Sequence, residues 1–190
     1  MGNGCRSPSC SVKLILLCSA EKPGKHKGMA HKQVLDWLAA HAPDVPVIIP
    51  GASTATVLEA AAVLGVEPAR IAKSLAMRVN GEALLLVTSG TARLDNQKCR
   101  AALGGKPRML DAEETLALTG HAVGGVCPFG LKTPLPVWLD VSLQAFATVF
   151  PAAGSRESSV EIAPQRLADL LAKGWVDACK LPEETATQPV

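Results

Sequence analysis

The dipeptide Asn80-Gly81 constrains the fold of this chain more than any other feature. It separates two runs of β-forming residues, 74–79 and 82–88. Asn-Gly readily adopts the positive φ angles of a two-residue hairpin turn, which makes it the strongest short hairpin signal in a sequence. The sequence therefore predicts an antiparallel hairpin centred on this pair.

Helices and strands alternate irregularly around this hairpin. Capping residues and apolar spacing predict helices over residues 31–40, from Ser53 or Thr54 to Gly65, after Asp95 or Asn96, after Asp111 and from Pro164, and strands over residues 45–49, 136–139, 148–150, 160–162 and 175–176. No repeating βαβ unit of about 30 residues is present. The pattern favours an α+β domain with a mixed sheet over a doubly wound parallel fold.

Residues 119–130 form an apolar run, Thr-Gly-His-Ala-Val-Gly-Gly-Val-Cys-Pro-Phe-Gly, with four glycines and one proline. Glycine permits positive φ and a close approach of other groups, and proline fixes φ. The run is typical of a loop folded onto the body of a protein, with backbone N–H groups directed at a ligand. A tight turn between a helix and a strand is the alternative.

The glycine run resembles a loop of the YbaK/EbsC-type aminoacyl-tRNA deacylases, whose Gly-x-x-x-Pro motif falls on Gly124 and Pro128. Four further segments resemble the same family in the same order: 71–75, 92–96, 103–106 and 135–140. The resemblance covers roughly residues 45–178. It implies one α+β domain with a curved mixed sheet surrounded by helices, and hydrolysis of a wrong small amino acid from tRNA, foremost tRNA(Pro), without a cofactor.

Lys73 is the leading catalytic candidate. It lies in an apolar segment, where a lysine must either extend to the surface or face a cleft, and burial would lower its pKa. The resemblance places at this position the lysine that the family requires for deacylation. Its ammonium would hold the 3′-terminal adenosine or its phosphate, or stabilise the developing oxyanion.

The glycine run supplies the other candidate site residues. Gly124 and Gly125 are expected to donate backbone N–H groups to the ester carbonyl, while Pro128 stiffens the loop. Phe129 and Cys127 are expected in the substrate pocket wall. The family acts through water, the ribose 2′-hydroxyl or the substrate's own side chain.

Four residues in or after this run bear on the assignment of roles and of the substrate. His121 and Cys127 are only weak candidates for a nucleophile pair, because they are six residues apart on an irregular loop. Ala152 is a further candidate for substrate binding, and it stands where the family often has serine. Asp140 is expected to have a structural role, capping the turn that follows it. Ala152 replaces the family serine, and Val126-Cys127 stands where members that act on cysteinyl-tRNA commonly have Ile-Ser, so the amino acid removed stays open.

Charge is unevenly distributed along the chain. Residues 1–28 contain five basic and one acidic residue, a formal charge of +4, whereas the remainder contains fourteen basic and sixteen acidic residues, or −2. A basic run between Arg93 and Arg108 fits either a solvated helix face or phosphate contacts. With the resemblance, we expect Arg93, Lys98 and Arg100 to bind tRNA weakly, with prolyl-tRNA synthetase as a partner and no DNA binding.

The cysteine spacing matches no zinc pattern, so we expect free thiols in the cytoplasm and neither a metal nor a cofactor. No apolar run approaches the ~18 residues that cross a bilayer.

Residues 1–28 are expected to be a disordered extension, although they faintly resemble a myristoylation or secretory signal. Residues 29–180 form the predicted domain, and residues 181–190 form a flexible tail. We expect a monomer or weak dimer.

The sequence thus predicts a trans-editing hydrolase. The alternative from another class is a catalytically silent module that binds tRNA or a synthetase and retains the same fold.

Overall fold

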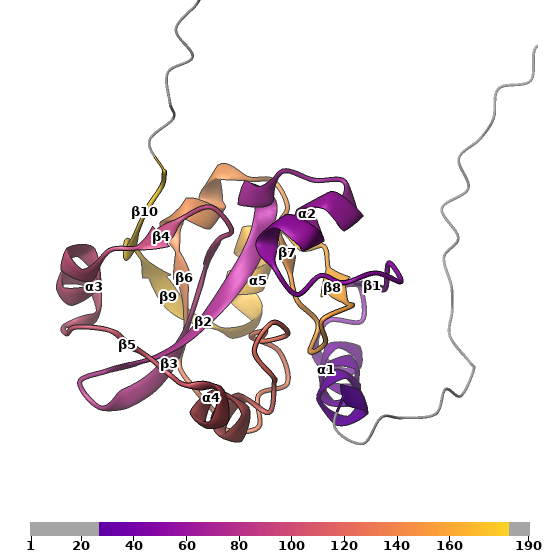
Figure 1. Ribbon diagram of the computed structural model, residues 1–190, viewed down its shortest axis with the longest axis horizontal. Helices are drawn as coiled ribbons and strands as arrows, with labels where there is room; N and C mark the ends of the chain where they lie inside the picture. The colour runs from indigo at the N-terminus through magenta and orange to yellow at the C-terminus, as the bar shows by residue number, and fades with distance from the viewer. Residues whose placement is uncertain (1–26, 183–190) are drawn as a thin grey trace, which may run out of the picture.

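The computed structural model describes residues 27–182 and shows a mixed sheet with helices packed around it (Figure 1). The predicted extension, residues 1–28, and the predicted tail, residues 181–190, lie outside these residues except for 27–28, which begin α1, and 181–182. The helices, in chain order, are α1 (Lys27–His41), α2 (Val57–Leu64), the 3₁₀ helix η1 (Pro68–Arg70), α3 (Asn96–Leu103), α4 (Ala112–Thr119), the 3₁₀ helix η2 (Val141–Ala145) and α5 (Pro164–Leu171). No helix within the described part of the chain is long and apolar enough to cross a membrane.

Within residues 27–182, six strands form the main sheet in the order β5-β2-β3-β6-β9, with β7 pairing with β2. β2 is antiparallel to β3 and β5, whereas the β2–β7, β3–β6 and β6–β9 pairs are parallel. The strands are β1 (Val47–Ile48), β2 (Ile71–Val79), β3 (Glu82–Ser89), β4 (Arg93–Leu94), β5 (Arg108–Met109), β6 (Val137–Asp140), β7 (Phe150–Pro151), β8 (Ser159–Val160), β9 (Ala172–Val176) and β10 (Cys179–Lys180). Both parallel and antiparallel pairs are present, which confirms the predicted α+β fold with a mixed sheet.

The predicted hairpin forms the centre of the sheet. β2 and β3 pair in continuous register up to Val79 and Glu82, and Asn80 and Gly81 have φ angles of 51° and 86°. Asn80 Nδ2 also donates to the Gly104 carbonyl at 3.1 Å, which links the turn to the end of α3. The hairpin is therefore stabilised both by local turn geometry and by a distant segment.

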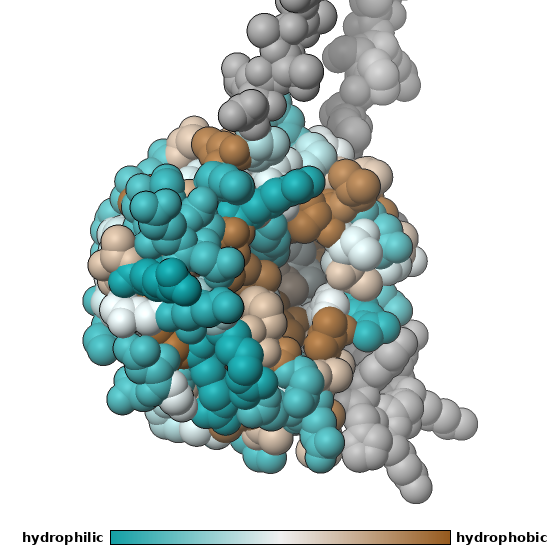
Figure 2. Space-filling view, turned by 60° about the vertical axis from the view of Figure 1, so that its left-hand side comes forward, coloured by the Kyte–Doolittle hydropathy of each residue, from teal (hydrophilic) through white to brown (hydrophobic). Residues whose placement is uncertain are grey.

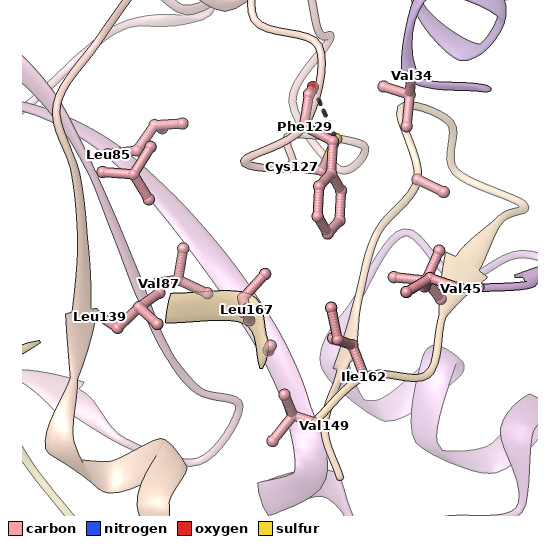
Figure 3. Packing of buried hydrophobic residues seen from close by; sticks show 14 of the residues in the cluster. Val34, Val45, Leu85, Val87, Cys127, Phe129, Leu139, Val149, Ile162 and Leu167 are labelled. Atoms are coloured by element: carbon pink, nitrogen blue, oxygen red, sulfur yellow. Dashed lines mark hydrogen bonds between the residues drawn. The ribbon is translucent and has the colours of Figure 1, made fainter. Parts of the chain in front are cut away.

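Alternation along the hairpin divides the core into two layers. Ala72, Ala76 and Val87 face the larger cluster, which includes α1, α5 and the end of the glycine run (Figure 3). Met77 and Leu86 face the other way, against α3 and the last strand. Because successive strand residues point to opposite faces, each hairpin strand contributes to both layers.

The predicted helix caps are confirmed at α3 and α4, where the side chains of Asp95 and Asp111 accept backbone N–H bonds. The prediction for α2 was wrong: its N-cap is Thr56, which forms a reciprocal capping box with Glu59. Ser53, one of the residues proposed as that cap, donates to Glu59 instead. The two-residue strands β4, β5 and β10 were not predicted, because so short a segment has no readable alternation.

Candidate functional site

A cavity of about 280 Å³ lies between β2, the start of α2, the glycine run and the segment around β7 and β8. Figure 2 shows a hollow with apolar walls on one face of the molecule, beside a strongly hydrophilic surface. β2 contributes residues 71–76, the glycine run contributes Val123, Gly124 and Val126, and Ala152 and Ser158 lie in the wall. The cavity thus brings Lys73, Gly124 and Ala152 together.

Lys73 is half-buried, and it is the one ionisable residue among the described residues that line the cavity. Its Nζ donates to the Gly90 carbonyl at 3.0 Å and to the Ala92 carbonyl. Burial lowers the pKa of Lys73, and the nearby Arg93 charge lowers it further, while Cys179 acts in the opposite direction. The ammonium therefore ties β2 to the turn that follows β3.

The alternation of side chains along β2 shows on which face of the sheet the Lys73 side chain lies. Lys73 pairs with Thr88, whose hydroxyl donates to Cys179 Sγ at 3.4 Å. Ala72 and Ser74 alternate with Lys73 along β2, so their side chains point to the other face of the sheet. Lys73 thus lines the cavity through its position on β2, while its side chain leaves the strand on the face opposite to that of Ser74 and its charge is held by main-chain carbonyls.

The two central glycines of the run have different surroundings. Gly124, with a φ of +89°, lines the cavity. Gly125 is buried, and its N–H donates to the Ala122 carbonyl at 2.9 Å within the turn, so this donor is already paired. The structure thus places Gly124, and not Gly125, at the cavity.

Arg156 holds the exposed part of the glycine run, and the sequence interpretation did not include it. Its Nε and Nη2 atoms donate to the Val123 carbonyl at 3.0 and 2.7 Å. A Cβ added to Gly124 would lie 3.1 Å from Arg156 Nε. No local pattern marks this arginine, because the contact joins residues 33 positions apart.

The second part of the glycine run lies in the core. Cys127 and Phe129 have no accessible surface, Pro128 is buried beside them, and none of the three lines the cavity. The Phe129 ring lies 5.6 Å from the Trp37 ring of α1, between centroids, and Cys127 Sγ donates to the Phe129 carbonyl (Figure 3). The structure therefore does not bring these three residues to the cavity.

His121 and Cys127 lie side by side but form no nucleophile pair. The His121 Nδ1 atom accepts the Cys127 N–H at 3.4 Å and lies 3.8 Å from the thiol sulfur. Burial lowers the pKa of His121 to about 4 and raises the pKa of Cys127 to about 12. Both groups are thus neutral at physiological pH, whereas a cysteine nucleophile reacts as the thiolate.

Asp140 has the structural role predicted for it. One carboxylate oxygen accepts the Ser142 N–H at 3.0 Å, and the other accepts the Ala178 N–H at 2.9 Å. Within residues 27–182, no group of three or more His, Cys, Asp or Glu residues could hold a metal ion.

The three candidate tRNA-binding residues are exposed on or near α3, which lies on the opposite side of β2 from α2 in Figure 1. Lys98 Nζ donates to both carboxylate oxygens of Asp177, at 2.8 and 3.1 Å. Within the described part of the chain, Arg93 and Arg100 make no ion pair. The structure thus separates Lys98 and Arg100 from the cavity, while Arg93 lies close enough to influence Lys73.

Comparison with known proteins shows a clear relationship. A family model described as "Aminoacyl-tRNA editing domain" matches residues 51–170, which include every residue that lines the cavity. "Uncharacterized protein YwhH" of Bacillus subtilis (strain 168) is 51% identical over 130 residues, covering 67% of this chain and 83% of that protein. "Putative Cys-tRNA(Pro)/Cys-tRNA(Cys) deacylase EbsC" of Enterococcus faecalis is 33% identical over 109 residues, covering 56% and 66%.

A solved structure is similar over nearly its whole length. It is described as "a putative trans-editing enzyme for prolyl tRNA synthetase", and it has a TM-score of 0.74 and 34% sequence identity. The similarity covers 80% of this chain and 98% of that one. The two chains therefore share one fold over most of this chain.

Proposed function

Because the chain belongs to the aminoacyl-tRNA editing domain family, we propose that it hydrolyses the ester that joins a wrong small amino acid to tRNA, and that tRNA(Pro) carries this ester. The observation that carries the proposal is the cavity, which Lys73, Gly124 and an exposed glycine turn border inside the matched segment. The deacylase and trans-editing activities in the names of two relatives support the same activity here.

The size and lining of the cavity support a small substrate side chain. Ligand pockets commonly measure roughly 300–1,000 Å³, so a cavity of about 280 Å³ fits an amino acid and not a large ligand. A synthetase pocket separates near-isosteric side chains by only ~1–3 kcal/mol, so prolyl-tRNA synthetase also needs a second site that removes alanine or cysteine.

The reaction needs no side-chain nucleophile. A water oxygen attacks the ester carbonyl carbon, the bond from that carbon to the ribose oxygen breaks, and the ribose oxygen takes up a proton. We assign to Gly124 the donation of its N–H to the oxyanion, and to Lys73 the electrostatic stabilisation of that charge or of the terminal adenosine. Gly125, whose N–H is paired with Ala122, is assigned a turn-forming role.

The first experiment measures release of the amino acid from alanyl-, cysteinyl-, seryl- and prolyl-tRNA(Pro) by the purified chain. We expect hydrolysis of at least one of the first three and little of prolyl-tRNA(Pro). Lys73→Ala is expected to reduce hydrolysis to near background, and Lys73→Arg to restore little of it, because guanidinium and ammonium differ in shape and hydration. Thermal unfolding of both variants separates this loss from loss of the contacts to Gly90 and Ala92.

A catalytically silent binding module is the second candidate. Ala152 favours it, because a methyl group lines the cavity where the family often has a hydroxyl. Binding of mischarged tRNA(Pro) without release of any amino acid would establish this candidate and contradict the first.

We further propose that Arg93, Lys98 and Arg100 contact tRNA phosphates, and that prolyl-tRNA synthetase strengthens this weak binding. Their exposure and positive charge support the proposal, although Asp177 already neutralises Lys98 in part. Phosphate contacts weaken with salt, so charge reversal at Arg93 or Arg100 should flatten the salt dependence of tRNA binding. An unchanged dependence would assign both arginines to a solvated surface.

A further inference from the structure

Two short strands cover the outer edge of β2 and leave a gap between them. β7 pairs only with Ile71 and Ala72, and β5 pairs only with Met77 and Arg78. No strand among residues 27–182 pairs with this edge between the two, over residues 73–76. Because residues 71–76 line the cavity, the uncovered edge opens into it.

The register of the hairpin shows which main-chain groups face this gap. Antiparallel pairs alternate between pairs that exchange both hydrogen bonds and pairs that exchange none. The Ala76 carbonyl accepts the Leu110 N–H at 3.0 Å, and the Leu85 N–H donates to the Pro136 carbonyl at 2.9 Å, so the Ala76–Leu85 pair directs its main-chain groups outward. Ser74 lies two residues before Ala76 and has the same orientation. Its N–H and C=O groups therefore point into the gap.

The hydroxyl groups at the cavity indicate that a ligand completes the site. Ser74 and Thr54 line the cavity, and their hydroxyl oxygens are buried and have no hydrogen-bond partner within the described part of the chain. By contrast, Ser89 on β3 lies outside the cavity and donates to the Ala69 carbonyl at 2.6 Å. A buried polar atom without a partner is costly and rare, and here two such atoms belong to residues that line one small cavity.

We propose that the aminoacyl part of the substrate adds to the edge of β2 at Ser74, as one residue of a further strand. This inference rests on the deacylase function proposed above. An aminoacyl ester presents an amino group and a carbonyl in the order of a peptide residue, and a free strand edge binds such groups. The Ser74 carbonyl accepts from the amino group, and the Ser74 N–H donates to the ester carbonyl oxygen.

This arrangement agrees with one further feature of the cavity, and it predicts which substrate side chains the cavity favours. None of the described residues in its wall is Asp or Glu, so the substrate amino group must bind main-chain or hydroxyl oxygens. Residues paired across an antiparallel ladder place their side chains on the same face. The side chain of the bound amino acid therefore lies beside the Ser74 hydroxyl, which favours a small side chain that carries a hydroxyl or thiol.

Nuclear magnetic resonance tests the main-chain contact directly. The ¹⁵N-labelled full chain is titrated with 3′-alanylamino-3′-deoxyadenosine, whose amide resists hydrolysis, and separately with 3′-amino-3′-deoxyadenosine. We expect a downfield shift of the Ser74 amide proton with the first compound only. Shifts at Gly124 and Met109 without a shift at Ser74 would overturn the inference and leave the proposed function intact. No shift at any cavity residue would contradict both.

A matched pair of variants tests the hydroxyl. Ser74→Ala removes an unpaired hydroxyl, so we expect an unchanged or higher Tm, with kcat/KM lowered about tenfold for seryl-tRNA and less for alanyl-tRNA. Ser89→Ala removes a paired hydroxyl outside the cavity, so we expect a lower Tm and an unchanged kcat/KM. If Ser74→Ala lowers Tm as Ser89→Ala does and leaves kcat/KM unchanged for both substrates, its hydroxyl is structural and the inference fails.

Discussion

The glycine run, residues 119–130, contains an exposed turn, residues 122–124, called here its exposed half, and a segment of the core, residues 127–130, called here its buried half. Val123 is about half exposed and Gly124 lines the cavity, whereas Cys127 and Phe129 have no accessible surface. The Arg156 side chain donates to the Val123 carbonyl in the exposed half, while the buried half packs against α1 and the sheet. One segment therefore combines a core anchor with an accessible turn, and the anchor fixes where the turn lies.

The glycines of the two halves are needed for different reasons. A Cβ at Gly130 would lie 2.9 Å from the Gln33 carbonyl oxygen of α1, a main-chain atom that cannot move aside. A Cβ at Gly124 would meet the end of the flexible Arg156 side chain and ordinary contact with Ala55. Close packing thus requires glycine in the buried half, while positive φ and access to the cavity favour it in the exposed half.

The largest expected effect falls on the buried half. Phe129→Ala should lower the free energy of unfolding by roughly 3–5 kcal/mol, because it leaves a cavity in the main core. Val123→Ala, in the exposed half, should change it by less than about 0.5 kcal/mol. Chemical denaturation of both variants measures the difference. If Phe129→Ala kept its stability and lost only activity, Phe129 would belong to the substrate pocket wall and the contrast between the halves would disappear.

The next effect is a pH dependence caused by His121. Burial lowers the pKa of His121 from 6.5 to about 4, so between these pH values the unfolded chain binds a proton that the folded chain does not. Its contribution to stability is complete above pH 6.5 and decreases by roughly 3 kcal/mol as the pH falls to 4.

Unfolding measured from pH 4 to 7 should show this slope in the unmodified chain and a much smaller slope in His121→Gln. His41→Gln, at an exposed position, serves as the control and should retain it. Equal slopes in the two variants would mean that His121 is not the group responsible.

The smallest effect concerns the exposed half. Gly124→Ala should lower kcat about ten- to a hundredfold, because the added Cβ crowds the proposed N–H donor and strains a φ of +89°. Gly81→Ala is the matched control, since Gly81 has a φ of +86° at the hairpin tip and no atom near its added Cβ. Both variants should lose some stability, and only Gly124→Ala should lose kcat. Equal kcat values would make Gly124 a turn residue without a catalytic role.

Features that depend on neighbouring residues could be predicted from the sequence. Asn80-Gly81 determines its own turn, and Asp95 and Asp111 cap the helices that they precede, because a few consecutive residues supply all the groups involved. The family resemblance likewise depends on short segments in a fixed order. For these reasons the sequence by itself predicts the α+β fold and the family.

Features that depend on distant residues required the tertiary structure. Gly124 and Gly125 are adjacent and identical in type, yet one lines the cavity and the other has its N–H bonded within the turn. The sequence is compatible with Phe129 in a pocket wall or in the core. The structure places it in the core, where it packs with residues of α1.

The gap at Ser74 exists because β5 and β7, separated by about 40 residues in the chain, stop short of each other along one edge of β2. Hydrogen bonding and packing act between groups that are close in space. A sequence therefore determines directly only the interactions whose two partners are also close along the chain.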